Sequence, residues 1–297
     1  YRMSEILKGR VAIITGAGGG LGAAHARVFA AEGCAVVVND INTDAAQAVV
    51  NEITAAGGKA VVNSSDITNY DDSLNAIKQA LESYGDLHIV LNNAGVNRDR
   101  MFASMTEQEW DTIMAVHLKG HFCISSHAVH YWRGRSKEGK PVDARIINTT
   151  SGAGLQGSIG QSNYAAAKAG IAALTLNQAA ELGRYNITAN AVAPSARTGM
   201  TSAVPEMAER MAEPEDGSFD HFAPENVSNL LAWLASAEAE SVSGRVFEAE
   251  GGRICICDGW RTTAGVDRGA AWAPSEIGTA MKELLAEEVP AQKVWGT

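Results

Sequence analysis

The stretch VAIITGAGGGLG, residues 11–22, decides the fold. Its first five residues are apolar or β-branched, glycine dominates the rest, and residues 23–31 follow as an alanine-rich segment with helical spacing. A buried strand, a glycine turn and a helix in this order bring backbone N–H groups onto a pyrophosphate at the helix N-terminus. The pattern predicts a dinucleotide loop, with cofactor-binding residues Gly16, Gly20, Leu21 and Gly22. A tight turn without a ligand is the alternative, because so many glycines fit several registers.

The second apolar run, residues 35–39, ends at Asp40. A carboxylate about twenty residues after the glycine loop can accept hydrogen bonds from the adenosine ribose. It would also repel a 2′-phosphate, and Gly18 and Gly19 stand where a phosphate-binding Arg or Lys is expected. These features favour NAD over NADP. Asp40 is also placed to favour the dipole of the helix predicted at 43–56, and the two roles are compatible.

Strand and helix patterns alternate along the rest of the chain. Further strands are predicted at 59–63, 87–91, 145–150, 187–193 and 245–249, with helical segments between them. Repeated units of this kind need right-handed crossovers and build a parallel sheet covered by helices on both faces. We predict one Rossmann-type, doubly wound α/β domain with a seven-stranded parallel sheet. It spans residues 4–297, with 261–297 as a C-terminal extension that contains a helix from Ser275.

Polar and small residues follow several of the predicted strands. Asp66 comes shortly after the third strand, with Ile67 beside it, and Asn93, Ala94 and Gly95 follow the fourth. The carboxyl ends of parallel strands share one edge of the sheet, where ligands bind in open α/β folds. Each residue alone could be a turn former. Together with Asp40 they indicate a cofactor cleft.

A second motif lies in the alanine-rich segment that begins at Gln161, which favours a helix. Tyr164 and Lys168 are four residues apart there, so both side chains project from one face. An ammonium beside a phenol favours the phenolate and lowers the tyrosine pKa, so that one group can both give and take a proton. The alternative is a surface tyrosine that shares a helical face with a solvated lysine.

The composition limits the classes of partner. The chain has 24 basic and 34 acidic residues and a net charge of −10, which argues against a nucleic-acid-binding surface and against adhesion to anionic membranes. A small-molecule partner is expected. The four cysteines form no Cys-x-x-Cys motif, and no apolar run is long enough to span a bilayer. These features predict a cytoplasmic protein.

A long helix is predicted at 106–132, opened by a capping box of Thr106 and Glu109. It contains four histidines, and a metal site is a hypothesis for the pair His117 and His121 at positions i and i+4. Packing is favoured over metal binding, because no acidic or cysteine ligand accompanies them and a catalytic zinc usually has three protein ligands. No metal is therefore expected.

Four motifs in order resemble the short-chain dehydrogenase/reductase family: Thr15-Gly16-x-x-x-Gly20-x-Gly22, Asn92-Asn93-Ala94-Gly95, Ser151 thirteen residues before Tyr164, and Tyr164-x-x-x-Lys168. The resemblance covers about residues 7–252. It implies that Tyr164 is the general acid/base, that Lys168 lowers its pKa and holds the nicotinamide ribose, and that Ser151 binds the substrate oxygen. It also implies that Asp66 and Ile67 flank the adenine and that residues 93–95 line the adenosine side.

The chain departs from the family pattern at His117, where the family usually has the fourth catalytic residue, an Asn. The proton relay attributed to that Asn is therefore not implied here. The segment around His117, with residues 160–164 and 193–196, is similar to the dehydrogenase domain of multifunctional β-oxidation enzymes. It is similar as well to bacterial hydroxysteroid and (R)-3-hydroxyacyl-CoA dehydrogenases.

The segment 194–221 is expected to fold over the nicotinamide side. By resemblance Thr198 would hold the carboxamide, and Thr201 is the alternative. An acyl chain or a steroid needs an apolar lining, which this segment could supply, although core packing explains the same residues equally well: Met200, Val204, Met207 and Met211.

The sequence thus predicts an NAD-dependent dehydrogenase of a hydroxysteroid or a (R)-3-hydroxyacyl-CoA, with Ser151, Tyr164, Lys168 and His117 as its catalytic set. One alternative is an NADPH-dependent reductase of a 3-oxoacyl carrier protein or a small ketone. Another is a non-catalytic dinucleotide sensor. The resemblance implies a homodimer or homotetramer built on the helices 106–132 and 161–184.

Overall fold

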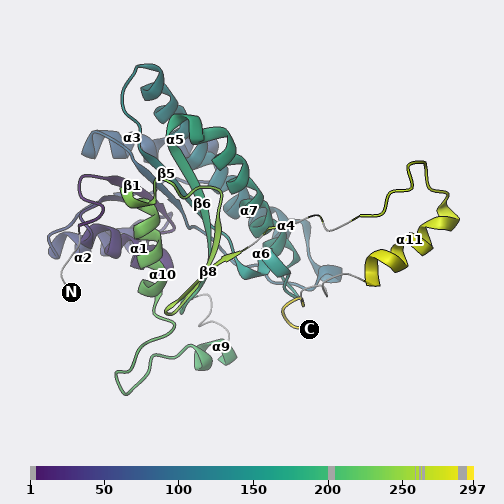
Figure 1. The fold of residues 1–297 in the computed structure, drawn as a ribbon. Coiled ribbons are helices and arrows are strands. Elements are labelled where there is room, and N and C mark those ends of the chain that lie inside the picture. Colours follow the sequence, from purple (N-terminus) through teal and green to yellow (C-terminus); the bar gives the residue numbers. More distant parts are fainter. Residues whose placement is uncertain (1–4, 200–204, 258, 261, 263–264, 287–292) are drawn as a thin grey trace.

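The computed structural model describes residues 5–199, 205–257, 259–260, 262, 265–286 and 293–297. At its centre is a sheet in the strand order β3-β2-β1-β4-β5-β6-β7-β8, with helices on both sides (Figure 1). The order reverses between β1 and β4, which places the crevice for a ligand beyond the carboxyl ends of these strands. The strands are β1 (Val11–Thr15), β2 (Ala35–Asn39), β3 (Lys59–Asn63), β4 (Ile89–Asn92), β5 (Ala144–Thr149), β6 (Ile187–Ser195), β7 (Val246–Glu250) and β8 (Arg253–Cys257).

The central strands β2, β1, β4 and β5 are buried along their whole length. Successive side chains of a strand point to opposite faces of the sheet, so each strand contributes side chains to two hydrophobic clusters. On β1, Ala12 and Ile14 belong to one buried cluster and Val11 and Ile13 to the other. Burial on both faces explains why these strands read as continuous apolar runs.

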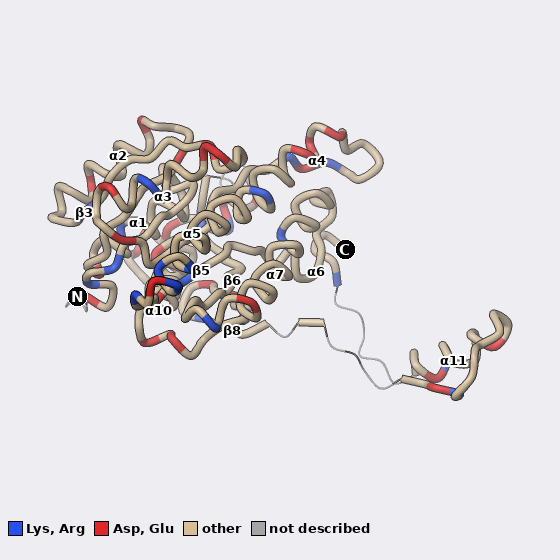
Figure 2. The backbone as a smooth tube through the Cα atoms, turned by 90° about the horizontal axis from the view of Figure 1, so that it is seen from above, with Lys and Arg blue, Asp and Glu red and all other residues tan. Residues whose placement is uncertain are grey.

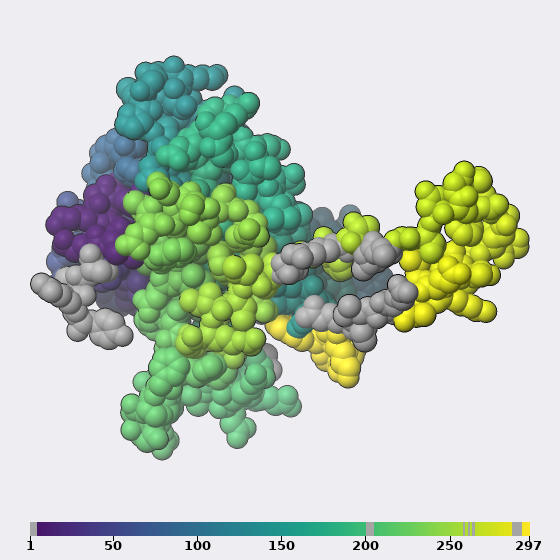
Figure 3. Space-filling model, in the orientation of Figure 1, coloured from purple at the N-terminus to yellow at the C-terminus, as the bar shows by residue number. Residues whose placement is uncertain are grey.

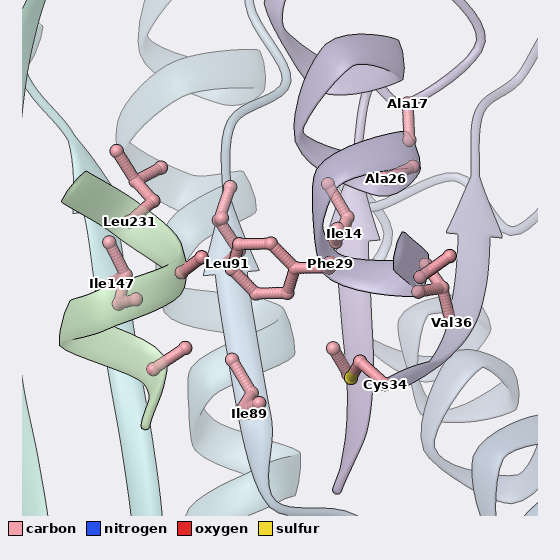
Figure 4. Packing of buried hydrophobic residues seen from close by; sticks show 14 of the residues in the cluster. Ile14, Ala17, Ala26, Phe29, Cys34, Val36, Ile89, Leu91, Ile147 and Leu231 are labelled. Atoms are coloured by element: carbon pink, nitrogen blue, oxygen red, sulfur yellow. The ribbon is translucent and has the colours of Figure 1, made fainter. Parts of the chain in front are cut away.

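Among the described residues, three helices pack on each face of the sheet. Figure 4 shows the first cluster, where Phe29 and Leu231 point from helices toward Leu91 of β4. Its helices are α1 (Gly20–Ala31), α2 (Thr43–Ala55) and α10 (Pro224–Ala235). The helices on the second cluster are α3 (Tyr70–Tyr84), α5 (Gly120–Lys137) and α7 (Ser162–Leu182). The predicted doubly wound α/β architecture is confirmed.

Local sequence signals fix several helix ends. The side chains of Asn42 and Asn69 cap α2 and α3 by accepting hydrogen bonds from the backbone N–H groups of Ala45 and Asp72. The C-terminus of α3 is capped by Gly85 in the left-handed conformation, with φ of 81°.

The sheet has one strand more than predicted, and the last pair, β7 and β8, is antiparallel. Glu250 pairs with Arg253, which leaves Gly251 and Gly252 as a two-residue connection. So short a connection can join only antiparallel strands, and a Gly-Gly pair suits such a hairpin. The seven-stranded, purely parallel sheet was therefore wrong at this edge.

The predicted helix 106–132 is interrupted. Its capping box is present, with the Thr106 side chain accepting from Glu109 N and the Glu109 side chain accepting from Thr106 N. The first part, α4 (Glu107–Ile113), is followed by a π-helical turn at Met114–Lys119 before α5 begins. This wider turn contains His117. Such turns occur frequently at functional sites.

The C-terminal extension has two parts in the structure. The helix α11 (Pro274–Ala286) projects away from the body (Figures 1 and 3). Residues 294–297 instead lie against the body beside α6 (Gly152–Gln156), the short helix that follows β5. The body carries lysines and arginines interspersed with acidic residues (Figure 2). Within the described residues, no helix has the length and apolar character needed to cross a membrane.

Candidate active site

The glycine loop between β1 and α1 is closely packed. Helix α1 starts at Gly20, three residues earlier than expected, so the last glycines of the motif belong to its first turn. A Cβ on Gly22 would lie 2.2 Å from Gly16 O and 2.6 Å from Asn93 Nδ2. A Cβ on Gly16, where φ is +62°, would lie 2.7 Å from Ala94 Cα. These two positions therefore require glycine.

The loop has open space at the start of α1. Gly19 is the N-cap residue, and no atom lies within 4 Å of where its Cβ would be. Because the first N–H groups of a helix lack partners within the helix, this opening suits an anionic group. The chain thus fits a dinucleotide pyrophosphate here.

Hydrogen bonds of Thr15 hold the end of β4 against the glycine loop. Thr15 Oγ1 accepts hydrogen bonds from Asn93 N (3.0 Å) and Ala94 N (3.1 Å), while Asn93 Nδ2 donates to Thr15 O (3.1 Å). The structure therefore brings Asn93 and Ala94 to the glycine loop, as the sequence predicts.

Asp40 lies over the same loop. Its Oδ2 accepts a hydrogen bond from Gly18 N (3.0 Å) and its Oδ1 accepts one from Asn42 N (2.9 Å). The helix-dipole alternative for Asp40 is compatible with this position, but the N-cap side chain of α2 is Asn42. The carboxylate is thus fixed at the carboxyl end of β2 and bonded to Gly18, the residue before the opening at Gly19.

The other predicted cofactor residues occupy the same edge of the sheet. Asp66 Oδ1 accepts from Thr68 N (2.8 Å) and Thr68 Oγ1 (2.7 Å), so this side chain stabilises its own turn. Ile67 is buried against Gly120. Thr198 lies beside the loop, with its Cβ 3.8 Å from the position of a Cβ on Gly20. The alternative, Thr201, lies outside the described residues.

The structure brings Tyr164, Lys168, Ser151 and His117 together. The Lys168 ammonium lies 5.5 Å from the centre of the Tyr164 ring, and the imidazole of His117 meets that ring edge-on at 5.2 Å. Ser151, the N-cap of α6, has a side-chain hydrogen bond with Tyr164. The surface alternative for the Tyr–Lys pair is wrong, since Lys168 is buried and donates to Thr149 O at 2.7 Å.

The electrostatics differ from the expected ones. Burial lowers the pKa of Lys168 to about 7, so much of its positive charge is lost near neutral pH. Burial raises the pKa of Tyr164, and the hydrogen bond with Ser151 opposes that rise. In this arrangement burial is the larger effect on the pKa of Tyr164, and the lowering of that pKa by the lysine stays a prediction.

His117 links the π-helical turn to the loop after β4. Its Nε2 lies 3.1 Å from Val96 N and 2.8 Å from Val96 O, so it accepts from the first or donates to the second according to its tautomer. A Cβ on Gly95 would lie 2.5 Å from His117 Cε1, which explains the glycine at that position. Burial lowers the pKa of His117 to about 3, so the ring is neutral at pH 7.

Sequence reasoning missed two residues that shape this site. Asn163 is buried, accepts from Tyr164 N (2.8 Å) and donates to Arg98 O (3.1 Å) and Glu109 O (3.3 Å). An amide directly before the tyrosine at the start of a helix was a signal for such bonding. The second is Trp295, more than 120 residues from the motifs, for which the sequence held no local signal.

A cavity of about 530 Å³ lies against Gly152, the residue that follows Ser151 in the chain. It is lined by Gly152, by the ends of β6, β7 and β8, by the segment after β6 and by the C-terminus. Met207 and Met211 line it, as expected for an apolar substrate, although Met211 is also part of the core. The other two apolar residues named above, Met200 and Val204, lie outside the described residues.

Buried histidines should make the protein less stable in mild acid. Burial lowers the pKa of His25, as that of His117, to about 3, against 6.5 when exposed. Between these values the unfolded chain binds more protons, so the free energy of unfolding falls as pH decreases below 6.5. Each histidine contributes at most about 1.4 kcal/mol per pH unit.

Urea unfolding between pH 7 and pH 5 measures this slope. His25→Gln should reduce it, whatever its effect on stability at pH 7. His130→Gln, at an exposed position on α5, is the control. An unchanged slope in His25→Gln would contradict the account.

Comparisons with known proteins agree with this geometry. A family model described as short chain dehydrogenase matches residues 10–209. The chain is 42% identical over 299 residues to hydroxyacyl-CoA dehydrogenase ChsB1 of Mycobacterium tuberculosis, covering 98% of this chain and 93% of that protein. It is 39% identical over 253 residues to peroxisomal multifunctional enzyme type 2 of Mus musculus, covering 83% of this chain and 32% of that one. The crystal structure of a short chain dehydrogenase from Mycobacterium avium matches with a TM-score of 0.90 and 52% identity, covering 98% of this chain and 100% of that chain.

Proposed function

The chain belongs to the short-chain dehydrogenase family, and from this premise we propose that it transfers hydride between NAD(H) and a bulky secondary alcohol or ketone. The observation that carries the proposal is the meeting of Ser151, Tyr164 and Lys168, with Ser151 one residue along the chain from Gly152 in the lining of a cavity of about 530 Å³. The substrate we propose is a (R)-3-hydroxyacyl-CoA or a hydroxysteroid. The name of the mycobacterial relative supports the acyl-CoA class.

In the oxidative direction, the residues act on the substrate hydroxyl. Tyr164 accepts the proton of the substrate hydroxyl, and a bound nicotinamide would supply the acceptor for the hydride. Ser151 donates a hydrogen bond to the substrate oxygen, and in the reverse direction it polarises the carbonyl. Lys168 holds the nicotinamide ribose, and Thr149 O orients its ammonium.

His117 positions Tyr164 rather than acting as an acid or base itself. Its ring is neutral at pH 7, is joined to Val96 and packs edge-on against the tyrosine. Thr198, beside Gly20, holds the nicotinamide carboxamide. Asp66 and Ile67 flank the adenine, as the family resemblance implies.

The preference for NAD rests on Asp40. Two backbone N–H groups fix its carboxylate over the glycine loop, where it can bind the ribose hydroxyls and repel a 2′-phosphate. Asp40→Asn keeps the size of the side chain and removes the charge. The ratio of kcat/KM for NAD to that for NADP should fall by at least about tenfold, since a charge pair near a protein surface exceeds about 1.4 kcal/mol.

The control for this variant is Asp44→Asn, which removes an exposed acid from the first turn of α2. The ratio of kcat/KM for NAD to that for NADP should stay within about twofold of the wild-type ratio, because water and salt screen distant surface charges. A wild-type enzyme that prefers NADPH would contradict the NAD assignment and favour the carrier-protein or small-ketone reductase.

The substrate class is tested by comparing kcat/KM for a (R)-3-hydroxyacyl-CoA, a 17β-hydroxysteroid and a 3-oxoacyl carrier protein. We expect one of the first two to be preferred. A preference for the carrier protein would contradict the proposal. NAD binding without turnover on all three would indicate a dinucleotide sensor.

We further propose a homodimer or homotetramer built on α4, α5 and α7. A shallow apolar groove lies between these helices, lined by Met114, Leu118, Phe122 and Leu174. Phe122 of this lining is 50% exposed. Light scattering should give a multiple of the 31.2 kDa chain mass, and a monomer would contradict this assembly.

The compartment we propose is the cytoplasm. None of the four cysteines forms a disulfide in the structure, which suits a reducing environment. The peroxisomal relative shows that the fold also occurs in an organelle.

A further inference from the structure

We propose that the C-terminal residues 294–297 form a clasp over the substrate cavity and that Trp295 is a specificity-determining residue, selecting substrates with a large apolar body. This inference rests on the proposed function. In it, residues 294–297 discriminate between substrates by the size of their apolar part.

The clasp is joined to the body by backbone hydrogen bonds. Trp295 N donates to Gly157 O (3.2 Å), and Ile159 N donates to Trp295 O (2.9 Å). Together these bonds form a short parallel bridge between Ser158 and Trp295. Val294 packs against Gly157, at 3.3 Å from the position of a Cβ there. Figure 1 shows the C-terminus on the body, beside α6 and apart from α11.

The indole of Trp295 reaches the residue next to Ser151. A Cβ on Gly152 would lie 2.4 Å from Cη2 and 2.7 Å from Cζ2 of this ring. Only a glycine allows so close an approach. Trp295 and Gly296 are also part of the cavity lining. The clasp therefore forms a wall of the cavity within one residue of the proposed oxygen-binding serine.

The chemistry of the cavity indicates its occupant. The lining that includes Trp295 also includes apolar and charged residues: Ala193, Pro194, Met207, Met211, Arg210, Arg253, Glu248 and Glu250. The indole is 49% exposed, so it has a large apolar surface to offer a ligand. Aromatic rings bury large apolar areas at low cost in conformational entropy. An acyl chain or steroid body that lies on this ring would be held beside Ser151, whereas a four-carbon substrate has little apolar surface to bury on it.

The test compares (R)-3-hydroxybutanoyl-CoA with (R)-3-hydroxydodecanoyl-CoA, which share the same coenzyme A group. Trp295→Ala should lower kcat/KM for the long substrate at least tenfold relative to the short one. The affinity for NADH should stay within about twofold. The matched control is Trp260→Ala, at a fully exposed tryptophan of the extension. Equal effects of the two variants on both substrates would overturn the proposal.

A second measurement separates this proposal from the proposed function. Butanoyl-CoA and dodecanoyl-CoA lack the hydroxyl group, so calorimetry on the NADH complex measures binding without turnover. Wild-type protein should bind dodecanoyl-CoA more tightly, and Trp295→Ala should lose that preference. If these binding preferences are found but neither hydroxyacyl-CoA is turned over, the proposed function is contradicted and the role of Trp295 in binding is not. No preference in wild type would overturn the role of Trp295.

The contact itself is tested by a double-mutant cycle on thermal stability. Gly152→Ala should lower Tm, because its methyl group collides with the indole. Adding Trp295→Ala should restore most of that loss, since the next atoms lie at least 3.4 Å away. Additive losses would show that the clasp does not lie on Gly152 and would overturn the proposal.

Discussion

Tyr164→Phe should lower kcat/KM for alcohol oxidation by about 10³-fold, within the usual range for loss of a general acid/base. The substitution keeps the ring, so its packing against His117 and Lys168 is preserved. It removes the hydroxyl that shares a hydrogen bond with Ser151. NADH binding, followed by fluorescence, should change by less than about twofold, because the loss is confined to proton transfer.

The matched control is Tyr131→Phe. Tyr131 lies on α5 and packs against the second hydrophobic cluster, and its hydroxyl donates a hydrogen bond to Asp86 at 2.8 Å. Its loss should cost at most about 1–2 kcal/mol of stability, with kcat/KM unchanged. A Tyr164→Phe enzyme with wild-type turnover would rule out the phenol as the proton acceptor.

Gly22→Ala should lower the free energy of unfolding by about 2–4 kcal/mol and abolish measurable NAD binding at millimolar concentration, as expected for overpacking against backbone. The added methyl group meets Gly16 O and Asn93 Nδ2, so the glycine loop and the end of β4 must separate. These are the elements that bring the cofactor residues together.

Gly19→Ala is the control for this stability effect. Its new Cβ would meet no atom within 4 Å, and the backbone there is extended, with φ of −166°. The free energy of unfolding should change by less than about 0.5 kcal/mol. Equal destabilisation by the two alanines would mean that the loop does not pack as described.

The sequence predicted the parts of the fold that local chemistry determines. The bounds of β1, β2 and β3 agree with the prediction to the residue, because apolar runs are properties of neighbouring residues. The pairing of Tyr164 with Lys168 followed from their helical spacing, and the place of Ser151 beside them from the family resemblance. Their contacts in the structure are those expected from the motif spacing.

Other features depend on contacts between distant parts of the chain. The π-helical turn at Met114–Lys119 contains His117, which is hydrogen-bonded to Val96. No local sequence pattern marks this turn. The pKa of Lys168 depends on burial by residues from several elements, so its partial loss of charge could not be read from spacing. Trp295 reaches Gly152 across more than 140 residues of chain. The hairpin at Gly251 and Gly252 was different, since its sequence signal was present and was overlooked.

The most direct test of the account is the initial rate of reduced cofactor formation with a (R)-3-hydroxyacyl-CoA, measured with NAD and with NADP in parallel. The account predicts turnover with NAD and a kcat/KM for NAD at least about tenfold above that for NADP, because of the charge of Asp40. Turnover that favours NADP, or no turnover of this substrate or a 17β-hydroxysteroid while NAD still binds, would contradict it.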